Sequence, residues 1–361
     1  MTSEQLGQPP AEQFRVAIVG YGLAGAVFHA PLIAATAGLT ISAVVTSNTE
    51  RAEQARAAHE GVVIYPNVDA LWGAADDIDL VVIATPNRDH APIAHAAIAA
   101  GIAVVVDKPF AVTVGEAESV IEAAAARGVP LSVFQNRRWD GDFLTLQRLL
   151  GEGALGEITR YESRFERWRP VIKAGWRESG TEADAGGLLF DLGAHLIDQA
   201  LVLFGSVTQV YAEIDGRREG VQAPDDVFVA LTHASGVRSH LWCSAVASDH
   251  APRMRVLGSR SAYVKYGLDV QEDALCTGDR PDRNPSWGAE PEARWGTLGV
   301  GGDASPVATE PGAYQRYYAA VAAALRGEGA LPVDPADSVE VLRTIEAARR
   351  SHDLGQVVAL P

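Results

Sequence analysis

The stretch FRVAIVGYGLAG, residues 14–25, decides the fold of this chain. Its first half is an apolar, β-branched run typical of a buried strand. The second half has the G-x-G-x-x-G spacing, in which the first glycine permits a tight turn, the second lets the backbone approach a pyrophosphate, and the third lets the next helix pack closely on the strand. Alone, this spacing also fits a glycine-rich turn in another kind of α/β protein. The expected cofactor-binding residues in this turn are Gly20, Gly22, Leu23, Ala24 and Gly25.

The context of the turn favours dinucleotide binding. From residue 14 to residue 135, short Val/Ile runs alternate with Ala-rich helical stretches. Near-continuous apolar runs indicate strands covered on both faces, and their regular alternation with helices predicts an α/β Rossmann domain over residues 13–135. Residues 136–361 carry consecutive strands with period-2 patterning, so we expect an α+β domain with an open, mostly antiparallel sheet. Residues 1–12 are expected to form a flexible N-terminus.

The composition agrees with two domains and restricts the partners. At 361 residues the chain has the length of two ordinary domains. Its 30 basic and 46 acidic residues leave a net charge of −16, which repels nucleic acid and membranes but allows a phosphorylated small molecule held by backbone N–H groups. With only Cys243 and Cys276, and no secretory signal in residues 1–13, a cytoplasmic setting is expected. The longest apolar stretch, residues 91–106, is too short to span a bilayer, which takes about 20 residues.

The end of the second predicted strand indicates which cofactor binds. Sites that prefer NAD usually carry Asp or Glu there, to bind the ribose 2′-hydroxyl. Here the strand ends Val45-Thr46-Ser47-Asn48 without an acid, and Arg51 follows. Hydroxyl groups and a guanidinium suit a 2′-phosphate, so we expect NADP, with NAD as the other candidate. A second interpretation is that these residues only cap the next helix and that Arg51 is a solvated charge; both can hold together.

Two further strand ends carry polar residues at the edge where a ligand binds. The fourth strand ends Thr85-Pro86-Asn87, and all three residues are expected to face the cofactor. The fifth ends Asp107-Lys108-Pro109, and Lys108 is one of only three lysines among the 30 basic residues. A compact ammonium suits the polarisation or protonation of a substrate oxygen, which predicts a catalytic role. The alternative is a surface lysine at a strand end.

A polar stripe marks one later helix, within TEADAGGLLFDLGAHLIDQALVLFG. At about 100° per residue, Asp191, His195, Asp198 and Gln199 fall on one side. Asp191 and His195 are four residues apart, so we expect them to hydrogen-bond, with the carboxylate supporting the positive form of the imidazole, as a general base requires. The alternative is a buried helix whose polar stripe faces water. No metal site is expected, because this pair supplies only two ligands.

Other residues are candidate substrate contacts. Arg137 and Arg138 follow the last Rossmann strand, although a role in linking the domains fits them equally well. Trp168 begins a basic and aromatic loop that continues through Arg177 and could line a sugar pocket or only pack. The Pro- and Gly-rich segment 277–312 is too long for a simple connection and is either an ordered excursion or a mobile flap.

Taken together, GYGLAG, ATPN, VDKP, QNRRWD and GGLLFDLGAHLIDQ resemble the glucose-fructose oxidoreductase / inositol dehydrogenase family, often called Gfo/Idh/MocA. The resemblance spans nearly the whole chain. Within the family it is similar to the branch that includes NADP-dependent scyllo-inositol dehydrogenases. One departure is Asp107, where the family most often has Glu before Lys-Pro.

The resemblance implies a substrate domain whose open sheet forms homodimers or homotetramers. It also implies that Lys108, Asp191 and His195 are catalytic, and that the last two bind substrate. The expected activity is the NADP-dependent interconversion of a secondary alcohol and a ketone on a cyclitol, polyol or sugar. Two alternatives stay open: a catalytically silent NADP-binding regulatory protein, and an NAD-dependent glycosidase of the same family.

Overall fold

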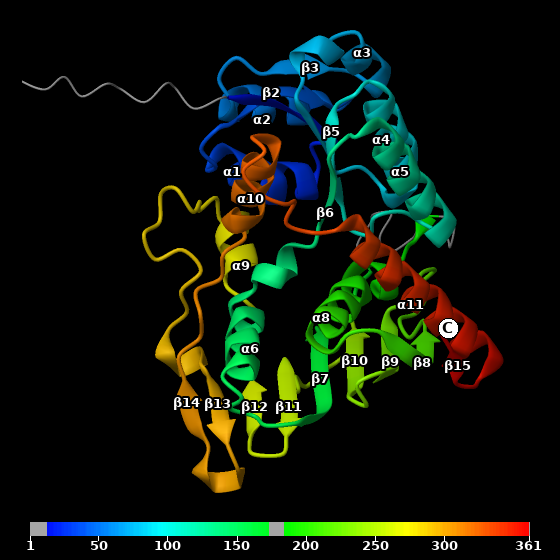
Figure 1. Ribbon diagram of the computed structural model, residues 1–361, viewed down its shortest axis with the longest axis vertical. Coiled ribbons are helices and arrows are strands. Elements are labelled where there is room, and N and C mark those ends of the chain that lie inside the picture. Colours follow the sequence, from blue (N-terminus) through cyan, green and yellow to red (C-terminus); the bar gives the residue numbers. More distant parts are fainter. Residues whose placement is uncertain (1–12, 173–183, 361) are drawn as a thin grey trace, which may run out of the picture.

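The computed structural model describes residues 13–172 and 184–360, and the first of its two sheets is a Rossmann sheet (Figure 1). The expected flexible segment 1–12, and the part of the Trp168 loop that contains Arg177, lie outside the described residues. Six parallel strands stand in the order β3-β2-β1-β4-β5-β6, as in a doubly wound dinucleotide-binding fold. They are β1 (Phe14–Val19), β2 (Leu39–Val45), β3 (Val63–Tyr65), β4 (Leu80–Ile83), β5 (Ala103–Asp107) and β6 (Leu131–Phe134).

Helices pack on this sheet, which explains its continuous apolar strands. Val82 and Ile83 of β4 and Val105 and Val106 of β5 are fully or almost fully buried. Alanine-rich sequence forms the covering helices, since alanine has the highest helix propensity and packs closely on strands. They are α1 (Ala30–Ala34), α2 (Thr49–Ala58), α3 (Val68–Trp72), α4 (His90–Ala99) and α5 (Val114–Arg127), with a π-helical turn at Ala24–His29 before α1.

The second sheet has nine strands in the order β14-β13-β12-β11-β7-β10-β9-β8-β15. Every neighbouring pair is antiparallel except β7 and β10, so the predicted fold class is confirmed. The strands are β7 (Ile158–Glu166), β8 (Val207–Asp215), β9 (Asp226–His233), β10 (Arg238–Ser244), β11 (Met254–Gly258), β12 (Ala262–Lys265), β13 (Gly296–Gly299), β14 (Ser305–Val307) and β15 (Val358–Ala359). Helices α6 (Gly141–Gly151) and α8 (Ala194–Phe204) lie beside it, whereas α9 (Gln271–Cys276) contacts the turn Ala24–His29 of the Rossmann domain.

The Pro- and Gly-rich segment 277–312 is the ordered excursion rather than a mobile flap. It contributes β13 and β14 to one edge of the second sheet. Trp287 anchors its middle, because the indole is 7% exposed and donates a hydrogen bond to the side chain of Gln271, at 3.1 Å.

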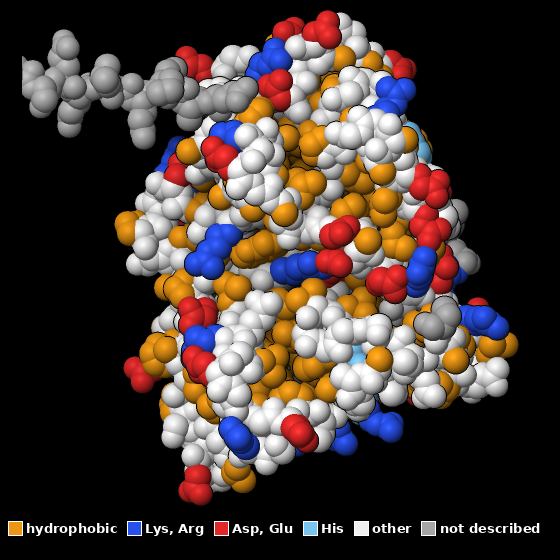
Figure 2. Space-filling model, in the orientation of Figure 1, with side chains coloured by type: hydrophobic (Ala, Val, Ile, Leu, Met, Phe, Trp, Pro, Cys, Tyr) orange, Lys and Arg blue, Asp and Glu red, His pale blue; other side chains and the backbone are white. Residues whose placement is uncertain are grey.

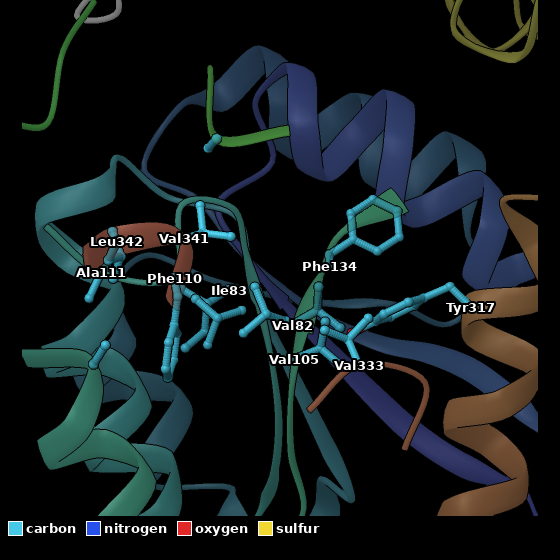
Figure 3. Packing of buried hydrophobic residues seen from close by; sticks show 14 of the residues in the cluster. Val82, Ile83, Val105, Phe110, Ala111, Phe134, Tyr317, Val333, Val341 and Leu342 are labelled. Carbon is cyan, nitrogen blue, oxygen red and sulfur yellow. The ribbon is translucent and has the colours of Figure 1, made fainter. Parts of the chain in front are cut away.

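The end of the chain bridges the two sheets: α10 (Gln315–Leu325) contacts α1, and α11 (Pro335–Leu354) packs on β8 of the second sheet and also contacts α5 and β6 of the first. Figure 3 shows Tyr317 and Val333 packed beside Phe134 of β6, next to the valines of β4 and β5. The rings of Phe134 and Tyr317 are 4.9 Å apart, and Ser132 donates a hydrogen bond to the carbonyl of Val333. The two halves are therefore held together beside β6. No helix in the described part of the chain is long and apolar enough to cross a membrane.

Candidate active site

A pocket of about 580 Å³ lies where the two halves of the molecule meet. In Figure 2, basic side chains lie among apolar ones along the band between the upper and lower halves. The lining combines the glycine-rich turn, the ends of β5 and β6, the segment leading into α8, the chain after β7, and α9. Among the described residues it includes Leu23, Ala24, Phe28, Asp107, Lys108, Phe134, Asn136, Arg137, Arg167, Arg169, Leu188, Asp191, Leu192, His195, Arg218, Ser244, Ala245, Glu272 and Cys276.

The glycine-rich turn has the geometry that a dinucleotide needs. Gly20 has φ of +93°, and a Cβ there would lie 2.6 Å from the carbonyl oxygen of Ala84. A Cβ on Gly25 would lie 2.0 Å from the carbonyl oxygen of Gly20, so only glycine lets the following helix approach the strand. A Cβ on Gly22 would meet only the guanidinium of Arg51, at 3.7 Å, which leaves its backbone open to a ligand. These residues fit a pyrophosphate at the start of the helix.

Arg51 is placed beside this turn by the cap of α2. The side chain of Asn48 accepts a hydrogen bond from the backbone N–H of Arg51, at 2.9 Å, and the hydroxyl of Thr46 accepts from the N–H of Asn48. The strand end therefore caps the helix, as one interpretation expected. Arg51 itself is exposed and has no ion pair with another described residue. Its guanidinium, together with Thr46 and the exposed Ser47, could hold a 2′-phosphate.

The end of β4 lies against the segment that leads into α8. The hydroxyl of Thr85 is buried without a hydrogen-bond partner in the described structure, and the Asn87 amide donates to the carbonyl of Ala185, at 3.1 Å. Both residues line a narrow notch that Lys108 and Asp191 also line. Pro86 precedes the helical turn Asn87–Asp89 and is absent from the described lining. This edge thus has polar groups available to a cofactor.

Lys108 and Asp191 bring the two halves together inside the pocket. The Lys108 ammonium donates to Asp191 Oδ1 at 2.9 Å and to the Asp191 carbonyl oxygen at 2.6 Å. The Lys108 side chain is 13% exposed, so its ammonium is mostly withdrawn from water. On the preceding residue, burial raises the pKa of Asp107, but His29 and Lys108 more than offset this effect and bring its pKa below the ordinary value. The site therefore holds an ammonium beside two carboxylates.

His195 lines the same pocket, but its surroundings differ from the expectation. No hydrogen bond joins it to Asp191: in the described structure Nδ1 is buried without a partner, and Asp191, on the π-helical turn Leu189–Gly193, bonds to Lys108 instead. Burial lowers the pKa of His195 well below 6.5, and the positive charges of Lys108 and Arg137 lower it further. The idea that a carboxylate supports the imidazolium is therefore wrong. The imidazole is held neutral, and Nε2 is the nitrogen left for a substrate.

The rest of the polar stripe binds protein groups and does not face water. Asp198 is 2% exposed and accepts two hydrogen bonds from Arg138, at 2.6 and 2.9 Å. Gln199 is fully buried, donates to the carbonyl of Arg137 at 2.9 Å and accepts from Arg253 at 3.0 Å. Helix α8 is thereby fixed against the junction between the two domains, with His195 directed to the pocket.

Of the three remaining candidate substrate contacts, one lies in the described lining of the pocket and two lie outside it. Arg137 lines the pocket, with its guanidinium bound to Glu272 at 2.5 Å. Arg138 is held by Asp198 and, at 3.0 Å, by Asp337, and it is not among the described lining residues. Its placement favours the alternative role of linking the domains. Trp168 is 55% exposed and also lies outside the described lining.

The sequence interpretation missed several residues of the pocket. Arg167 lines it, and the alternation of side chains along a strand could have indicated this residue; Arg169, which belongs to the loop expected to line a pocket, does line it. Glu272 and Arg218 also line it. Glu272 stands on the short helix α9, far along the chain, and no spacing connects it with the other site residues.

Family models match both halves of the chain. Residues 14–135 match the family model described as "Oxidoreductase family, NAD-binding Rossmann fold", and residues 143–264 match the model described as "GFO/IDH/MocA C-terminal domain".

Relatives and solved structures cover almost the whole chain. The chain is 41% identical to the uncharacterized oxidoreductase YdgJ of Escherichia coli strain K12, over 93% of this chain and 95% of that protein. It is 38% identical to the scyllo-inositol 2-dehydrogenase (NADP(+)) IolW of Bacillus subtilis strain 168, over 96% and 95%. The structure of the oxidoreductase yvaA from Bacillus subtilis superposes with a TM-score of 0.91 at 35% identity, over 98% of this chain and all of that one.

Proposed function

Since the chain belongs to the Gfo/Idh/MocA family of NAD(P)-dependent oxidoreductases, we propose that it interconverts a secondary alcohol and a ketone on a cyclitol, polyol or sugar, with NADP as cofactor. One observation carries the proposal: the ammonium of Lys108 and the neutral imidazole of His195 line one pocket beside a glycine turn that fits a dinucleotide. A cation and a neutral base are the two groups that removal of a hydroxyl proton requires.

In the oxidation direction, His195 Nε2 accepts the proton of the reacting hydroxyl. Because burial and nearby cations keep the imidazole neutral, it is ready to accept this proton at neutral pH. Lys108 donates a hydrogen bond to the same oxygen and stabilises the negative charge that develops there. Asp191 holds the ammonium through its carboxylate and its carbonyl. When bound, the nicotinamide supplies the hydride acceptor.

The preference for NADP rests on the end of β2. Thr46, Ser47 and Arg51 offer two hydroxyls and an exposed guanidinium where an NAD site usually has a carboxylate. Arg51 lies against Gly22, on the side of the turn where the adenosine end of a dinucleotide is bound. The relative IolW carries NADP(+) in its name, which supports the same assignment.

The substrate class rests on the polar lining of the pocket. Arg137, Asp191 and His195 can each bond to a hydroxyl group of a polyol, and the relative IolW is named for scyllo-inositol. We also propose that the chain forms homo-oligomers through the outer face of the second sheet. There the ring centres of Phe228 and Trp242 lie 5.1 Å apart with the planes tilted by 35°, and the guanidinium of Arg164 lies 3.9 Å from the centre of the Trp242 ring. Light scattering of the purified protein tests this proposal.

A two-stage assay tests the activity. First, NADPH and NADH are titrated by fluorescence, and we expect NADPH to bind more tightly. Inositols, monosaccharides and 1,5-anhydro-ketoses are then screened for a change of absorbance at the nicotinamide band. NADH binding about tenfold tighter, a difference of about 1.4 kcal/mol, would reverse the cofactor assignment. Tight NADPH binding without turnover on the whole panel would favour the silent regulatory protein.

A further inference from the structure

The described lining of the pocket is positively charged, whereas the protein as a whole is negatively charged. The chain has a net charge of −16, yet the described lining of the pocket has five cationic and three anionic side chains. Three of the cations are bound to carboxylates: Lys108 to Asp191, Arg137 to Glu272, and Arg218 to Asp225 at 2.6 Å. The third anion of the described lining, Asp107, lies beside His29 and Lys108. Arg167 and Arg169 are therefore the two cations of this lining that form no close ion pair with a described carboxylate.

Strand pairing directs both of these arginines into the pocket. The chain after β7 stays extended, because the backbone N–H groups of Arg167 and Arg169 donate to the carbonyls of Ser244 and Ala245, each at 2.8 Å. Alternate side chains of an extended segment point to the same side, so the two guanidiniums share the pocket and Trp168 points away. The guanidinium of Arg218 donates to the carbonyl of Arg169 at 3.2 Å and helps to fix the segment.

Among the described residues, this pair of arginines has only a shared and distant carboxylate partner. The nearest one to Arg167 is Glu272, at 3.8 Å, and Glu272 is already bound to Arg137 at 2.5 Å. Arg169 has no ion pair with a described residue. The Arg167 side chain is only 23% exposed. Burial lowers the pKa of Arg167; Glu272 and Asp191 raise it in part, and Arg169 and Arg137 lower it, so that the net shift is downward. Such an arrangement is stabilised when an anion enters the pocket.

We infer that the substrate carries an anionic group, a carboxylate or a phosphate, which Arg167 and Arg169 bind on the β7 side of the pocket while Lys108 and His195 act on a hydroxyl elsewhere on the same molecule. The inference rests on the proposed function and narrows its substrate class to acidic or phosphorylated sugars and polyols. The planar fork of arginine matches the oxygens of either group, and each bond between two charged partners is about twice as strong as a neutral one.

Calorimetric titration with matched probes tests this inference. The probes are methyl D-glucoside, methyl D-glucuronoside and methyl D-glucoside 6-phosphate, which differ only at one end. They are titrated with and without NADPH; none has a free carbonyl group for NADPH to reduce, so the titration reports binding alone. We expect at least one anionic probe to bind about 10- to 100-fold more tightly than the neutral parent, and which one does so distinguishes carboxylate from phosphate.

Variants separate charge recognition from a structural role. In Arg167→Gln and in Arg169→Gln, we expect the ratio of anionic to neutral affinity to fall about tenfold or more, whereas Arg167→Lys, which keeps the charge but not the planar fork, should lower the ratio less than Arg167→Gln does. Arg160→Gln is the matched control, because Arg160 is an exposed arginine of β7 outside the described lining. If the arginines were only structural, both affinities would change together and the ratio would stay constant.

The binding experiment distinguishes an error in the anionic substrate group from an error in the proposed oxidoreductase activity. Equal affinity for all three probes in the wild type, or an unchanged ratio in both glutamine variants, would overturn the inference even if the enzyme oxidised neutral polyols. A strong preference for an anionic probe, lost in Arg167→Gln, would sustain it even if no redox turnover were found. In that last case only the proposed function would be in error.

Discussion

The ammonium of Lys108 lies 2.9 Å from Oδ1 of Asp191, although the two residues are 83 positions apart and belong to different domains. Lys108 directly follows β5 of the Rossmann sheet, and Asp191 lies on the π-helical turn that leads into α8. This ion pair is therefore a direct contact between the cofactor side and the substrate side of the pocket. It also fixes the ammonium inside the pocket, where we propose that it contacts the reacting oxygen.

Replacing Lys108 should stop catalysis and leave cofactor binding intact. In Lys108→Met we expect kcat to fall about 10²- to 10⁴-fold, because the developing alkoxide loses its hydrogen-bond donor. Steady-state turnover and a fluorescence titration with NADPH measure the two quantities. Lys108→Arg is the control for charge alone, and since its guanidinium is larger and cannot occupy the same place, it should also be impaired. Equal losses of turnover and of NADPH affinity would instead indicate a role in cofactor binding.

The neutral state of His195 should be visible in the pH profile. Its pKa lies well below 6.5, because the ring is buried and faces Lys108 and Arg137. In the oxidation direction kcat/KM should therefore show no loss of the base as the pH falls through 6.5, and should decline only at lower pH. His195→Gln should lower kcat about 10²- to 10⁴-fold at every pH. If kcat/KM fell to half its maximum near pH 6.5, and this midpoint stayed the same in variants that lack other titrating side chains of the pocket, the assignment would be contradicted.

The same pKa shift links His195 to stability. In the unfolded chain the imidazole takes up a proton near pH 6.5, whereas in the folded protein it does so only at lower pH. The contribution of the His195 imidazole to the free energy of unfolding is therefore complete above about pH 6.5. It is lost as the pH falls from there toward the pKa that the imidazole has in the folded protein. Between these values, urea denaturation of His195→Gln should show a pH slope shallower by at most about 1.4 kcal/mol per pH unit. Identical slopes for both proteins would be inconsistent with a depressed pKa.

Arg138 should prove to be a structural residue. Its partner Asp198 is 2% exposed, so Arg138→Ala leaves a buried carboxylate without its cation and should cost about 3 to 5 kcal/mol in the free energy of unfolding. Asp337→Ala is the matched control, because Asp337 is the other partner of Arg138 and its side chain is 49% exposed. This substitution should lower the free energy of unfolding by about 1 kcal/mol or less. Equilibrium denaturation measures both. Similar small losses for the two variants would show that the buried pair contributes little.

Arg51 should decide between the two cofactors. In Arg51→Ala we expect the Kd for NADPH to rise about tenfold or more, because a bond between a guanidinium and a phosphate is lost, while the Kd for NADH stays unchanged. Arg56→Ala, at the other end of α2, removes an exposed arginine bound to Glu53 and should change neither constant. A parallel loss of affinity for both cofactors in Arg51→Ala would argue against a phosphate contact.

The first domain could be predicted from the sequence because its signals are local. The roles of Gly20 and Gly25 depend on atoms of the adjacent strand and turn, and the structure shows the close approaches that their spacing implies. Continuous apolar runs likewise identified every strand of the Rossmann sheet. In the second sheet, β13, β14 and β15 have two to four residues each, which is too few for a period-2 pattern to be recognised.

The details of the site depend on contacts that no local pattern encodes. Asp191 and His195 have the right spacing for a hydrogen bond, but a lysine from the other domain binds the carboxylate instead. Arg137 and Arg138 are adjacent in sequence, yet one lines the pocket and the other is bound by Asp198, since neighbouring side chains point in different directions. Glu272 reaches the pocket only through the fold of the second domain.

The transfer of deuterium from substrate to cofactor directly tests whether the protein transfers hydride to NADP⁺ with the help of Lys108. Wild-type protein and Lys108→Met are incubated with NADP⁺ and with cyclitols, polyols and sugars deuterated at their carbinol carbons, and the reduced cofactor is analysed by mass spectrometry. We expect deuterium in NADPH for at least one substrate with the wild type. In Lys108→Met, which still binds NADPH, the rate of transfer should be about 100-fold or more lower. Unlabelled NADPH with every substrate, or equal rates of label transfer in the two proteins, would contradict it.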